Sequence, residues 1–444
     1  MESILTRPCC SWSSPLLLSG CSVLLISWAA PNRWLHWHGA AWIALVPLLL
    51  LCWGRGSFQS QIKILLGIWG PASVLIFWPD FLAVQWLSWL EIAVGWMILL
   101  LLPFGLVLIS WISLWVSRGV PPGFRPFCLA SAWVSCDLLL GVCRCPIPLH
   151  WGVTLYDWPP GIQIADLVGI WGVTWLIVYV NGLIALLIQE GPRPHLRPLM
   201  LGTVVLLVGV GSYSHLRLQQ LATWLPLPSD LRVAALQPVG WLERDRSWLY
   251  REQQYQVLLD LSLQGIREGA TLIIWPEGAL RARLLGTDLE PYLIHPVTQA
   301  LPAQGGLITG SAEPDPDFIS GETATRRNYN TALLFNAHGE LEAWYGKQWI
   351  FPFFEAKRFS PAPGGYQPLQ SSSLGRLGVL ICLESVLPHP SRALVQRGAE
   401  VLVVIADDSS FGNSYWPRLH AALAVFRAVE NRRSLVLLTI PAAI

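Results

Sequence analysis

Charged residues are scarce in this chain. Only 13% of its 444 residues are Asp, Glu, Lys or Arg, whereas 53% are hydrophobic, and the net charge is +1. Because positive and negative charges are nearly equal in number, the chain lacks the excess of basic residues with which proteins bind nucleic acids. So large an apolar share is typical of a membrane protein.

The first 217 residues contain long stretches without any charge. Such stretches cover 8–32, 34–54, 64–79, 92–117, 167–189 and 198–216, and the further run 126–143 contains only Asp137. A membrane-spanning helix needs about 20 apolar residues, so 64–79 and 126–143 are marginal. We predict seven membrane helices. The first run is too long for a cleavable signal peptide, and the next follows at once.

Basic residues are almost absent from every second loop between these runs. The basic loops carry Arg55 with Lys63, Arg118 with Arg125, and Arg193 with Arg197, whereas the alternate loops carry Asp80, Glu91, Asp157 and Asp166 against Arg33 and Arg144. Positively charged loops stay in the cytoplasm. We therefore expect a cytoplasmic N-terminus, and seven crossings place everything after Arg217 outside.

Cysteine is nearly missing from the second half. Eight of the nine cysteines precede residue 150, so the ninth, Cys382, has no partner for a disulfide within its own domain. Cys382 ends the apolar run 378–381, and a helix is expected from about Ser385. A cysteine between a strand and a helix is a candidate nucleophile, because a helix N-terminus favours the thiolate. The alternative is a small buried apolar residue.

Lysine is also rare, with three against a total of 29 Lys and Arg. Lys347 follows a predicted strand, and Glu277 stands at the end of another, 271–275, directly after Pro276. Lysine is a compact charge whose pKa shifts on burial, a role that arginine cannot fill. Either residue alone could be an ordinary surface charge. No His or Cys cluster has metal-ligand spacing, so we predict no metal and no cofactor.

Three short motifs carry a family resemblance. They are W-P-E at 275–277, Y-x-K-x-x-x-x-P-F-x-E at 345–355 and I-C-x-E at 381–384, in that order. They resemble the nitrilase superfamily. With the apolar N-terminal half, the whole chain is similar to its membrane-bound members, the apolipoprotein N-acyltransferases, most specifically over residues 231–433.

The resemblance implies a two-part fold. Residues 1–217 would form a polytopic helical membrane domain of about seven helices. Residues 218–444 would form an extracytoplasmic α/β catalytic domain, the nitrilase αββα sandwich, shortened at its C-terminus. Alternating predicted strands and helices after Arg217 agree with two packed sheets flanked by helices.

The resemblance also implies the site and the reaction. The catalytic residues would be Glu277, Lys347 and Cys382, with Glu355 and Glu384 as supporting or substrate-positioning carboxylates. Aromatic residues that would contact acyl chains, or simply fill the core, are Trp241, Trp248, Trp349, Phe351 and Phe353. The expected enzyme is monomeric and lies in the bacterial inner membrane. It moves an acyl chain from a phospholipid to the α-amine of a diacylglyceryl apolipoprotein, through a thioester on Cys382.

Two other functions stay open at this point. The same three residues would serve a membrane-tethered amidase or nitrilase that acts on a small C–N substrate. The shortened C-terminus would also fit a non-catalytic relic. His420, Arg427 and Glu430 match a family pattern and are interpreted as structural supports. Asp137, an acid within a predicted span, is interpreted as structural, satisfied by nearby backbone or by Arg144.

Overall fold

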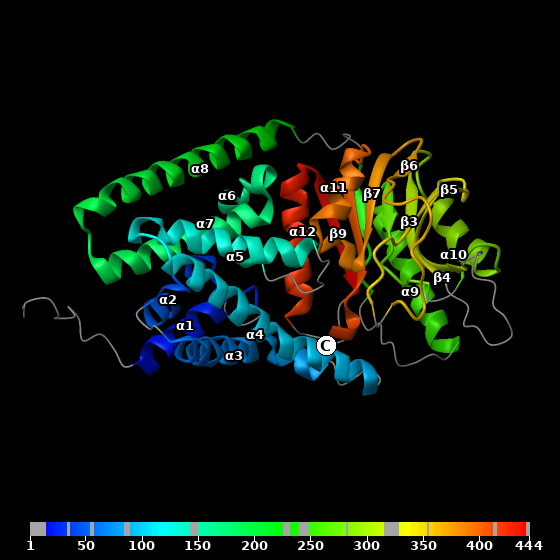
Figure 1. The fold of residues 1–444 in the computed structure, drawn as a ribbon. Helices are drawn as coiled ribbons and strands as arrows, with labels where there is room; N and C mark the ends of the chain where they lie inside the picture. Colours follow the sequence, from blue (N-terminus) through cyan, green and yellow to red (C-terminus); the bar gives the residue numbers. More distant parts are fainter. Residues whose placement is uncertain are drawn as a thin grey trace, which may run out of the picture.

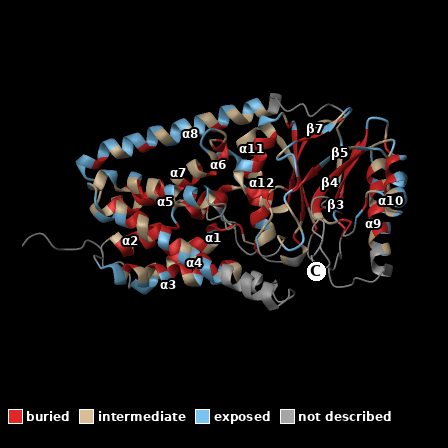
Figure 2. Ribbon diagram, turned by 45° about the vertical axis from the view of Figure 1, so that its right-hand side comes forward, coloured by how far each residue is buried: buried red, intermediate tan, exposed pale blue. Residues whose placement is uncertain are grey.

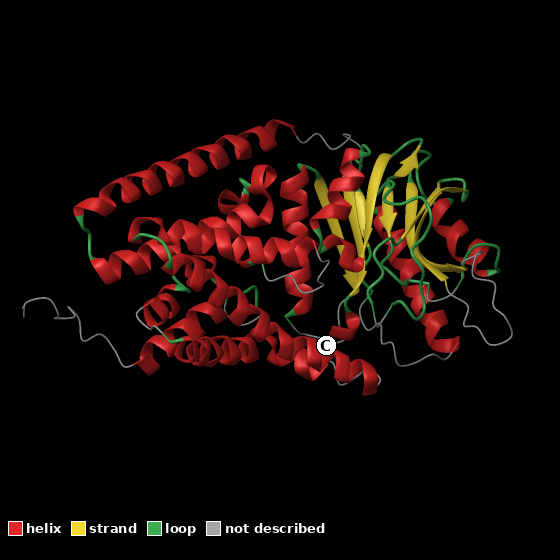
Figure 3. Cartoon of the chain, viewed as in Figure 1, coloured by secondary structure: helices red, strands yellow, loops and turns green. Residues whose placement is uncertain are grey.

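The computed structural model has two parts, a helical bundle and a sandwich of β-strands (Figure 1, Figure 3). It describes residues 15–32, 36–53, 57–83, 89–142, 150–224, 231–238, 248–280, 283–314, 328–352, 355–411 and 415–440. Helices make up the N-terminal part, and every strand belongs to the C-terminal part. This division confirms the predicted fold class.

The bundle contains all seven predicted apolar runs, on helices of unequal length. They lie on α1 (Pro15–Ala29), a 3₁₀ turn (His38–Trp42) with α2 (Val46–Trp53), α3 (Phe58–Ala83), α4 (Trp89–Arg118), α5 (Arg125–Val142), α7 (Ala165–Glu190) and α8 (Arg197–Trp224). Within the described residues, the last five are long and apolar enough to cross a membrane, whereas the first two are shorter.

Two details of the predicted spans were wrong for local reasons. The run 34–54 is not one helix, because the 3₁₀ turn at His38–Trp42 is followed by a break before α2 begins. The run 64–79 looked too short for a membrane span only because the charged residues Lys63 and Asp80 flank it. Both charged residues lie inside α3, which is 26 residues long. A charge near the end of a helix therefore shortens the apolar run without ending the helix.

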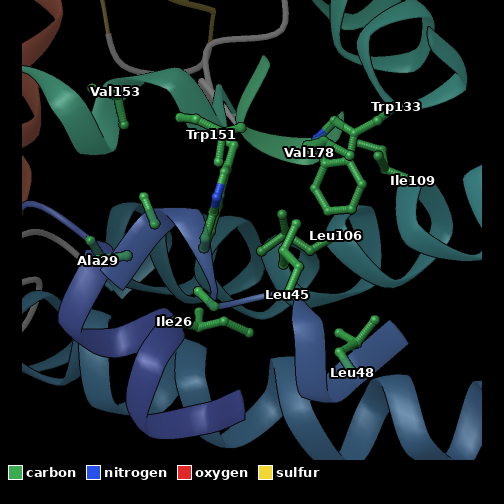
Figure 4. Close-up of a cluster of buried hydrophobic side chains, with 14 of the residues drawn as sticks. Ile26, Ala29, Leu45, Leu48, Leu106, Ile109, Trp133, Trp151, Val153 and Val178 are labelled. Atoms are coloured by element: carbon green, nitrogen blue, oxygen red, sulfur yellow. The ribbon is translucent and has the colours of Figure 1, made fainter. Parts of the chain in front are cut away.

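Large apolar side chains fill the core of the bundle and also lie on its outer surface. Ile26, Leu45, Leu48 and Trp133 belong to its packed core (Figure 4). The outer surfaces of α4 and α8 are also apolar, with Leu101, Phe104, Leu108, Trp115, Leu201, Val205 and Val208 all exposed (Figure 2). Helices that are apolar all round suit a hydrocarbon surrounding.

Asp137 is paired with a histidine within the described part of the bundle. Its Oδ2 lies 2.9 Å from Nδ1 of His150, and both side chains are buried. Arg144, one of the two partners suggested from the sequence, lies outside the described residues. The spacing of thirteen residues between Asp137 and His150 gave no sign of this pair.

The sandwich is built from two sheets. The first has the order β1 (Val233–Ala235), β2 (Leu272–Ile274), β3 (Gly306–Pro314), β4 (Asn328–Asn336) and β5 (Leu341–Gly346), and the second β6 (Leu369–Ser371), β7 (Gly375–Ile381), β8 (Val401–Asp407) and β9 (Ser434–Ile440). Strands β1 to β3 are parallel, and β4 and β5 continue antiparallel. Strands β7 to β9 are parallel, with Val379 opposite Val403.

Alternating side chains along the strands explain the layers. Val379 and Ile381 of β7 face the first sheet in a core shared with Ile274 and Leu334. Leu380, between them, packs under α11 (Pro388–Gln396) instead. Helices α9 (Trp248–Arg267) and α10 (Leu289–Thr298) cover the outer face of the first sheet. With α12 (Trp416–Asn431) beside α11, the predicted αββα order is confirmed.

Helix α12 joins the two parts of the molecule. Its Leu419, Leu423 and Phe426 are buried in the same core as the helices of the bundle, and it packs along α7. A charged cluster adds to this junction. The buried carboxylate of Asp166 pairs with Arg432, just after α12, at 2.6 Å, and with Arg217 of α8 at 3.1 Å. The sandwich is therefore seated directly on the bundle.

Candidate active site

The three predicted catalytic residues each follow a strand. Glu277 comes after β2, Lys347 directly after β5 and Cys382 directly after β7. The side-chain Nζ of Lys347 lies 3.6 Å from Oε1 of Glu277. The charges of both residues act on the Cys382 thiol: Glu277 raises its pKa and Lys347 lowers it. The fold thus brings together residues that are 35 to 105 positions apart in sequence.

Cys382 stands at a sharp turn of the backbone. Ile381 is still extended, whereas Cys382 has φ +53°, in the left-handed region, and opens a short 3₁₀ turn to Ser385. Among the described non-glycine residues only Arg432 shares such a φ. The conformation costs about 1–2 kcal/mol for a residue with a Cβ. Neighbouring contacts must therefore hold it.

Glu384 supplies several of these contacts. Its carboxylate is fully buried and accepts hydrogen bonds from the Tyr345 hydroxyl at 2.9 and 3.0 Å, and from the backbone N–H of Ile381 at 2.9 Å. It also accepts from the N–H groups of Gln348 at 2.8 Å and Trp349 at 3.2 Å. These contacts do not support the prediction that Glu384 positions the substrate. It joins the turn at Cys382 to the segment that carries Lys347.

Lys347 lies between two carboxylates. Its side chain has no exposed surface, and Nζ donates to Oε1 of Glu355 at 2.5 Å. The other oxygen of Glu355 accepts the N–H of Phe351 at 2.8 Å. Burial alone would lower the pKa of Lys347, but the charges of Glu355 and Glu277 outweigh burial and raise it above its ordinary value. The ammonium is therefore charged and fixed in position.

Glu277 is a buried carboxylate with a raised pKa. Oε1 accepts from Nδ2 of Asn330 at 2.8 Å, and Oε2 accepts from the N–H of Asp407 at 3.0 Å. Burial raises its pKa most, and nearby Glu355 and Asp407 raise it further, against Lys347 and Asn330. A carboxylate with a raised pKa is a stronger base, which suits it to take a proton from a thiol.

The Cys382 thiol itself is protonated at rest. Burial and the charge of Glu277 raise its pKa well above the ordinary value, and Lys347 only partly offsets them. Burial and the Glu277 charge therefore oppose the thiolate that the position before a helix was expected to favour. The site contains a neutral nucleophile, a base and a fixed cation.

Two family models match this chain. The model described as carbon-nitrogen hydrolase covers residues 232–436, and the model described as apolipoprotein N-acyltransferase N-terminal domain covers residues 22–183. The chain belongs to the apolipoprotein N-acyltransferase family, within the nitrilase superfamily. Like other members, it is a multi-pass membrane protein.

Relatives in the family match along most of the chain. It is 28% identical over 426 residues to the apolipoprotein N-acyltransferase of Geobacter metallireducens, covering 89% of this chain and 78% of that protein. It is 26% identical to that of Chlorobaculum tepidum, covering 95% and 84%. Among solved structures it is similar to a carbon-nitrogen hydrolase from Helicobacter pylori (19% identity, TM-score 0.36, 47% and 71% covered) and to an amidase from Nesterenkonia sp. (22%, 0.35, 47% and 76%).

The aromatic residues predicted to contact acyl chains are only partly placed in this member of the apolipoprotein N-acyltransferase family. Trp241, Phe353 and the side chain of Trp248 lie outside the described residues. Trp349 is 7% exposed. Its ring packs edge to face against that of Phe351, with 5.9 Å between the two ring centroids. Burial of Trp349 agrees with the alternative of an ordinary core residue.

Sequence reasoning missed one neighbour of the site. Asn330 holds Glu277, yet it lies inside the apolar strand β4 and belongs to no motif used above. Its carbonyl also accepts the N–H of Lys347 at 2.8 Å. A polar residue in an otherwise buried strand was the available signal. Its meaning depended on the pairing of β4 with β5, which the sequence does not state.

The three family-pattern residues of α12 divide between two tasks. Arg427 is buried and donates through Nη2 to Glu430 at 3.2 Å. Glu430 in turn accepts the N–H of Ile170 at 2.9 Å, just after α7 is interrupted at Gly169. These two residues therefore attach the sandwich to the bundle. His420 points to the other side of the junction, toward Cys382.

Proposed function

We propose that this chain transfers a fatty acyl group from a membrane phospholipid to the α-amine of an apolipoprotein's N-terminal diacylglyceryl-cysteine, through a thioester on Cys382. The observation that carries the proposal is a partly buried thiol beside a buried ammonium and a buried carboxylate, at the strand ends of a domain seated directly on the helical bundle. Both proposed substrates are anchored in the bilayer, which explains why the sandwich is packed directly against the helical bundle.

We likewise propose residues 1–217 as the membrane domain and 218–444 as the catalytic domain.

The first half-reaction forms the thioester. Glu277 takes the proton from Cys382 while the sulfur attacks the carbonyl carbon of a phospholipid ester. The carbonyl oxygen becomes an oxyanion, which the Lys347 ammonium and the N–H of Leu383 stabilise. When the oxyanion collapses, the C–O bond breaks, and Glu277 returns its proton to the departing lyso-phospholipid.

The second half-reaction moves the acyl group to nitrogen. The free α-amine attacks the thioester carbonyl and passes a proton to Glu277. The same donors stabilise the second oxyanion. Its collapse forms the amide and breaks the C–S bond, and Glu277 returns the proton to the sulfur. Glu355 keeps Lys347 aimed at the oxyanion throughout, by the contact described above.

Mass spectrometry of the purified, detergent-solubilised protein after incubation with phospholipid tests this function. We expect a fatty acyl group on the peptide that contains Cys382, released on addition of a diacylglyceryl-cysteine peptide. An unmodified thiol that still reacts with an alkylating reagent would favour an amidase of small substrates instead. An inert thiol would indicate a non-catalytic protein.

The membrane orientation gives a separate prediction. A reporter enzyme that is active only outside the cytoplasm should be active when fused after Leu216, and inactive when fused at Pro194. The positively charged loops support this orientation. The sandwich contacts the bundle at Asp166, near the start of α7, whereas Arg125 pairs with Glu190 at the opposite end of that helix. The reverse pattern of activity would place the catalytic domain in the cytoplasm.

A further inference from the structure

A row of buried polar side chains lies behind Cys382, and the proposed reaction steps do not use it. Nε2 of His420 is 3.1 Å from the carbonyl oxygen of Cys382 and 2.7 Å from Oγ of Ser385. Nδ1 of His420 is 3.0 Å from Oδ2 of Asp408, which also accepts from the Thr439 hydroxyl at 2.9 Å. His420, Asp408 and Ser385 are all essentially without exposed surface.

Both ring nitrogens of His420 face acceptors. The carbonyl oxygen of Cys382 can only accept, and an ionised Asp408 can only accept. The Ser385 hydroxyl lies 2.9 Å from the Cys382 carbonyl and 2.7 Å from Nε2, so it can donate to either of them. The Cys382 carbonyl can only accept, so its contact with Nε2 is a hydrogen bond when Nε2 carries a proton.

The geometry fits a ring whose Nε2–H donates to the Cys382 carbonyl and whose Nδ1 faces Asp408. Burial lowers the pKa of His420, but the charge of Asp408 outweighs burial and raises it above the usual range. The Trp416 indole also lies beside the ring, and the Glu277 carboxylate acts on it at longer range.

The carbonyl that His420 holds is part of the peptide that joins Cys382 to Leu383. A peptide unit is planar and trans, so its C=O and its N–H point in opposite directions. Fixing the Cys382 oxygen against His420 and Ser385 therefore fixes the direction of the Leu383 N–H. The same contact resists relaxation of the left-handed φ at Cys382.

We propose that His420, held by Asp408, is a positioning residue whose Nε2–H fixes the Cys382 carbonyl and so aims the Leu383 N–H at the oxyanion. This inference rests on the proposed function. It gives His420 a task in the rate of acyl transfer beyond support of the fold. Oxyanion donors act only in correct geometry, so a misdirected N–H loses most of its effect on rate.

Two substitutions at position 420 test this assignment. A glutamine places its amide N–H near the position of Nε2 and can still donate to the Cys382 carbonyl. An asparagine reaches only as far as Nδ1 and leaves that carbonyl without its partner on α12. We expect His420→Asn to slow thioester formation about tenfold to a hundredfold relative to His420→Gln, with the KM for phospholipid unchanged.

Alkylation separates positioning from a general loss of structure. Iodoacetamide reacts with a thiol without forming an oxyanion, so the alkylation rate of Cys382, followed by peptide mapping, should be alike in both variants. Ser385→Ala removes the other donor to the same carbonyl and should slow thioester formation without slowing alkylation. The same His→Asn change at exposed His389 on α11 is the matched control and should leave both rates at the wild-type value.

Equal rates of thioester formation in His420→Asn and His420→Gln would overturn the inference, as would parallel losses of thioester formation and alkylation. Failure of the proposed function would look different. In that case the wild-type protein would form no thioester on Cys382 at all.

Discussion

Replacing Lys347 by arginine is expected to abolish thioester formation almost as completely as replacing it by alanine. The Lys347 side chain is fully buried, with Nζ at 2.5 Å from Glu355 and 3.6 Å from Glu277. Arginine is longer, and its charge is spread over a rigid planar fork. An oxyanion donor must stand within about 3 Å of the oxygen, and an error of about 1 Å can cost on the order of a hundredfold in rate.

The measurement is the rate of acyl-enzyme formation on Cys382 in both variants. Lys357 offers a matched control, because it lies ten residues further along, is exposed, and should tolerate arginine without loss. A wild-type rate in Lys347→Arg would show that Lys347 is not the oxyanion donor. The proposed site would then lose its only fixed cation within the described residues.

Replacing Cys382 by serine is expected to abolish acyl transfer while leaving the fold intact. The buried Glu277 carboxylate has a raised pKa and is a competent base for a thiol. A hydroxyl is a far weaker acid, so the same carboxylate cannot activate it. Serine is nearly isosteric with cysteine, and we therefore expect an unchanged midpoint of thermal unfolding.

Transfer is measured with a phospholipid donor and a diacylglyceryl-cysteine peptide. Cys128→Ser, on α5 of the bundle, is the control and should keep full activity. If Cys382→Ser transfers acyl chains at the wild-type rate, the reaction does not pass through a thioester on this residue. Loss of both transfer and thermal stability would instead point to a structural role for the thiol.

The parts of the site that could be predicted from sequence are those that end strands. Glu277 follows Pro276, and Cys382 follows an apolar run, so each position was marked by a local change in pattern. Lys347 was marked by the rarity of lysine. These marks identified the residues one by one, whereas their meeting depends on how the two sheets pack, because β2 and β5 belong to the first sheet and β7 to the second.

The parts that could not be predicted depend on pairings between distant segments. Asn330 contacts Glu277 because β3 joins β2 to β4, and it lies beside Lys347 because β4 pairs with β5. Glu384 was predicted to position the substrate. In the structure its carboxylate oxygens accept hydrogen bonds from the Tyr345 hydroxyl and from backbone N–H groups at Gln348 and Ile381, which belong to two separate segments. Asp137 likewise pairs with His150, a partner that the sequence did not suggest. No local pattern encodes which of several nearby partners a buried carboxylate will take.

Helix α12 sets the height of the nucleophile above the bilayer. It contains 16 residues and is therefore about 24 Å long. Its apolar face is packed into the core of the bundle, while His420 on the same helix touches the Cys382 carbonyl. The sulfur is thus held at a fixed position relative to the bundle, because α12 packs into the bundle core and contacts the Cys382 backbone. In the proposed reaction a lipid ester would have to reach that level, because the catalytic domain cannot tilt on the bundle without disrupting the shared core.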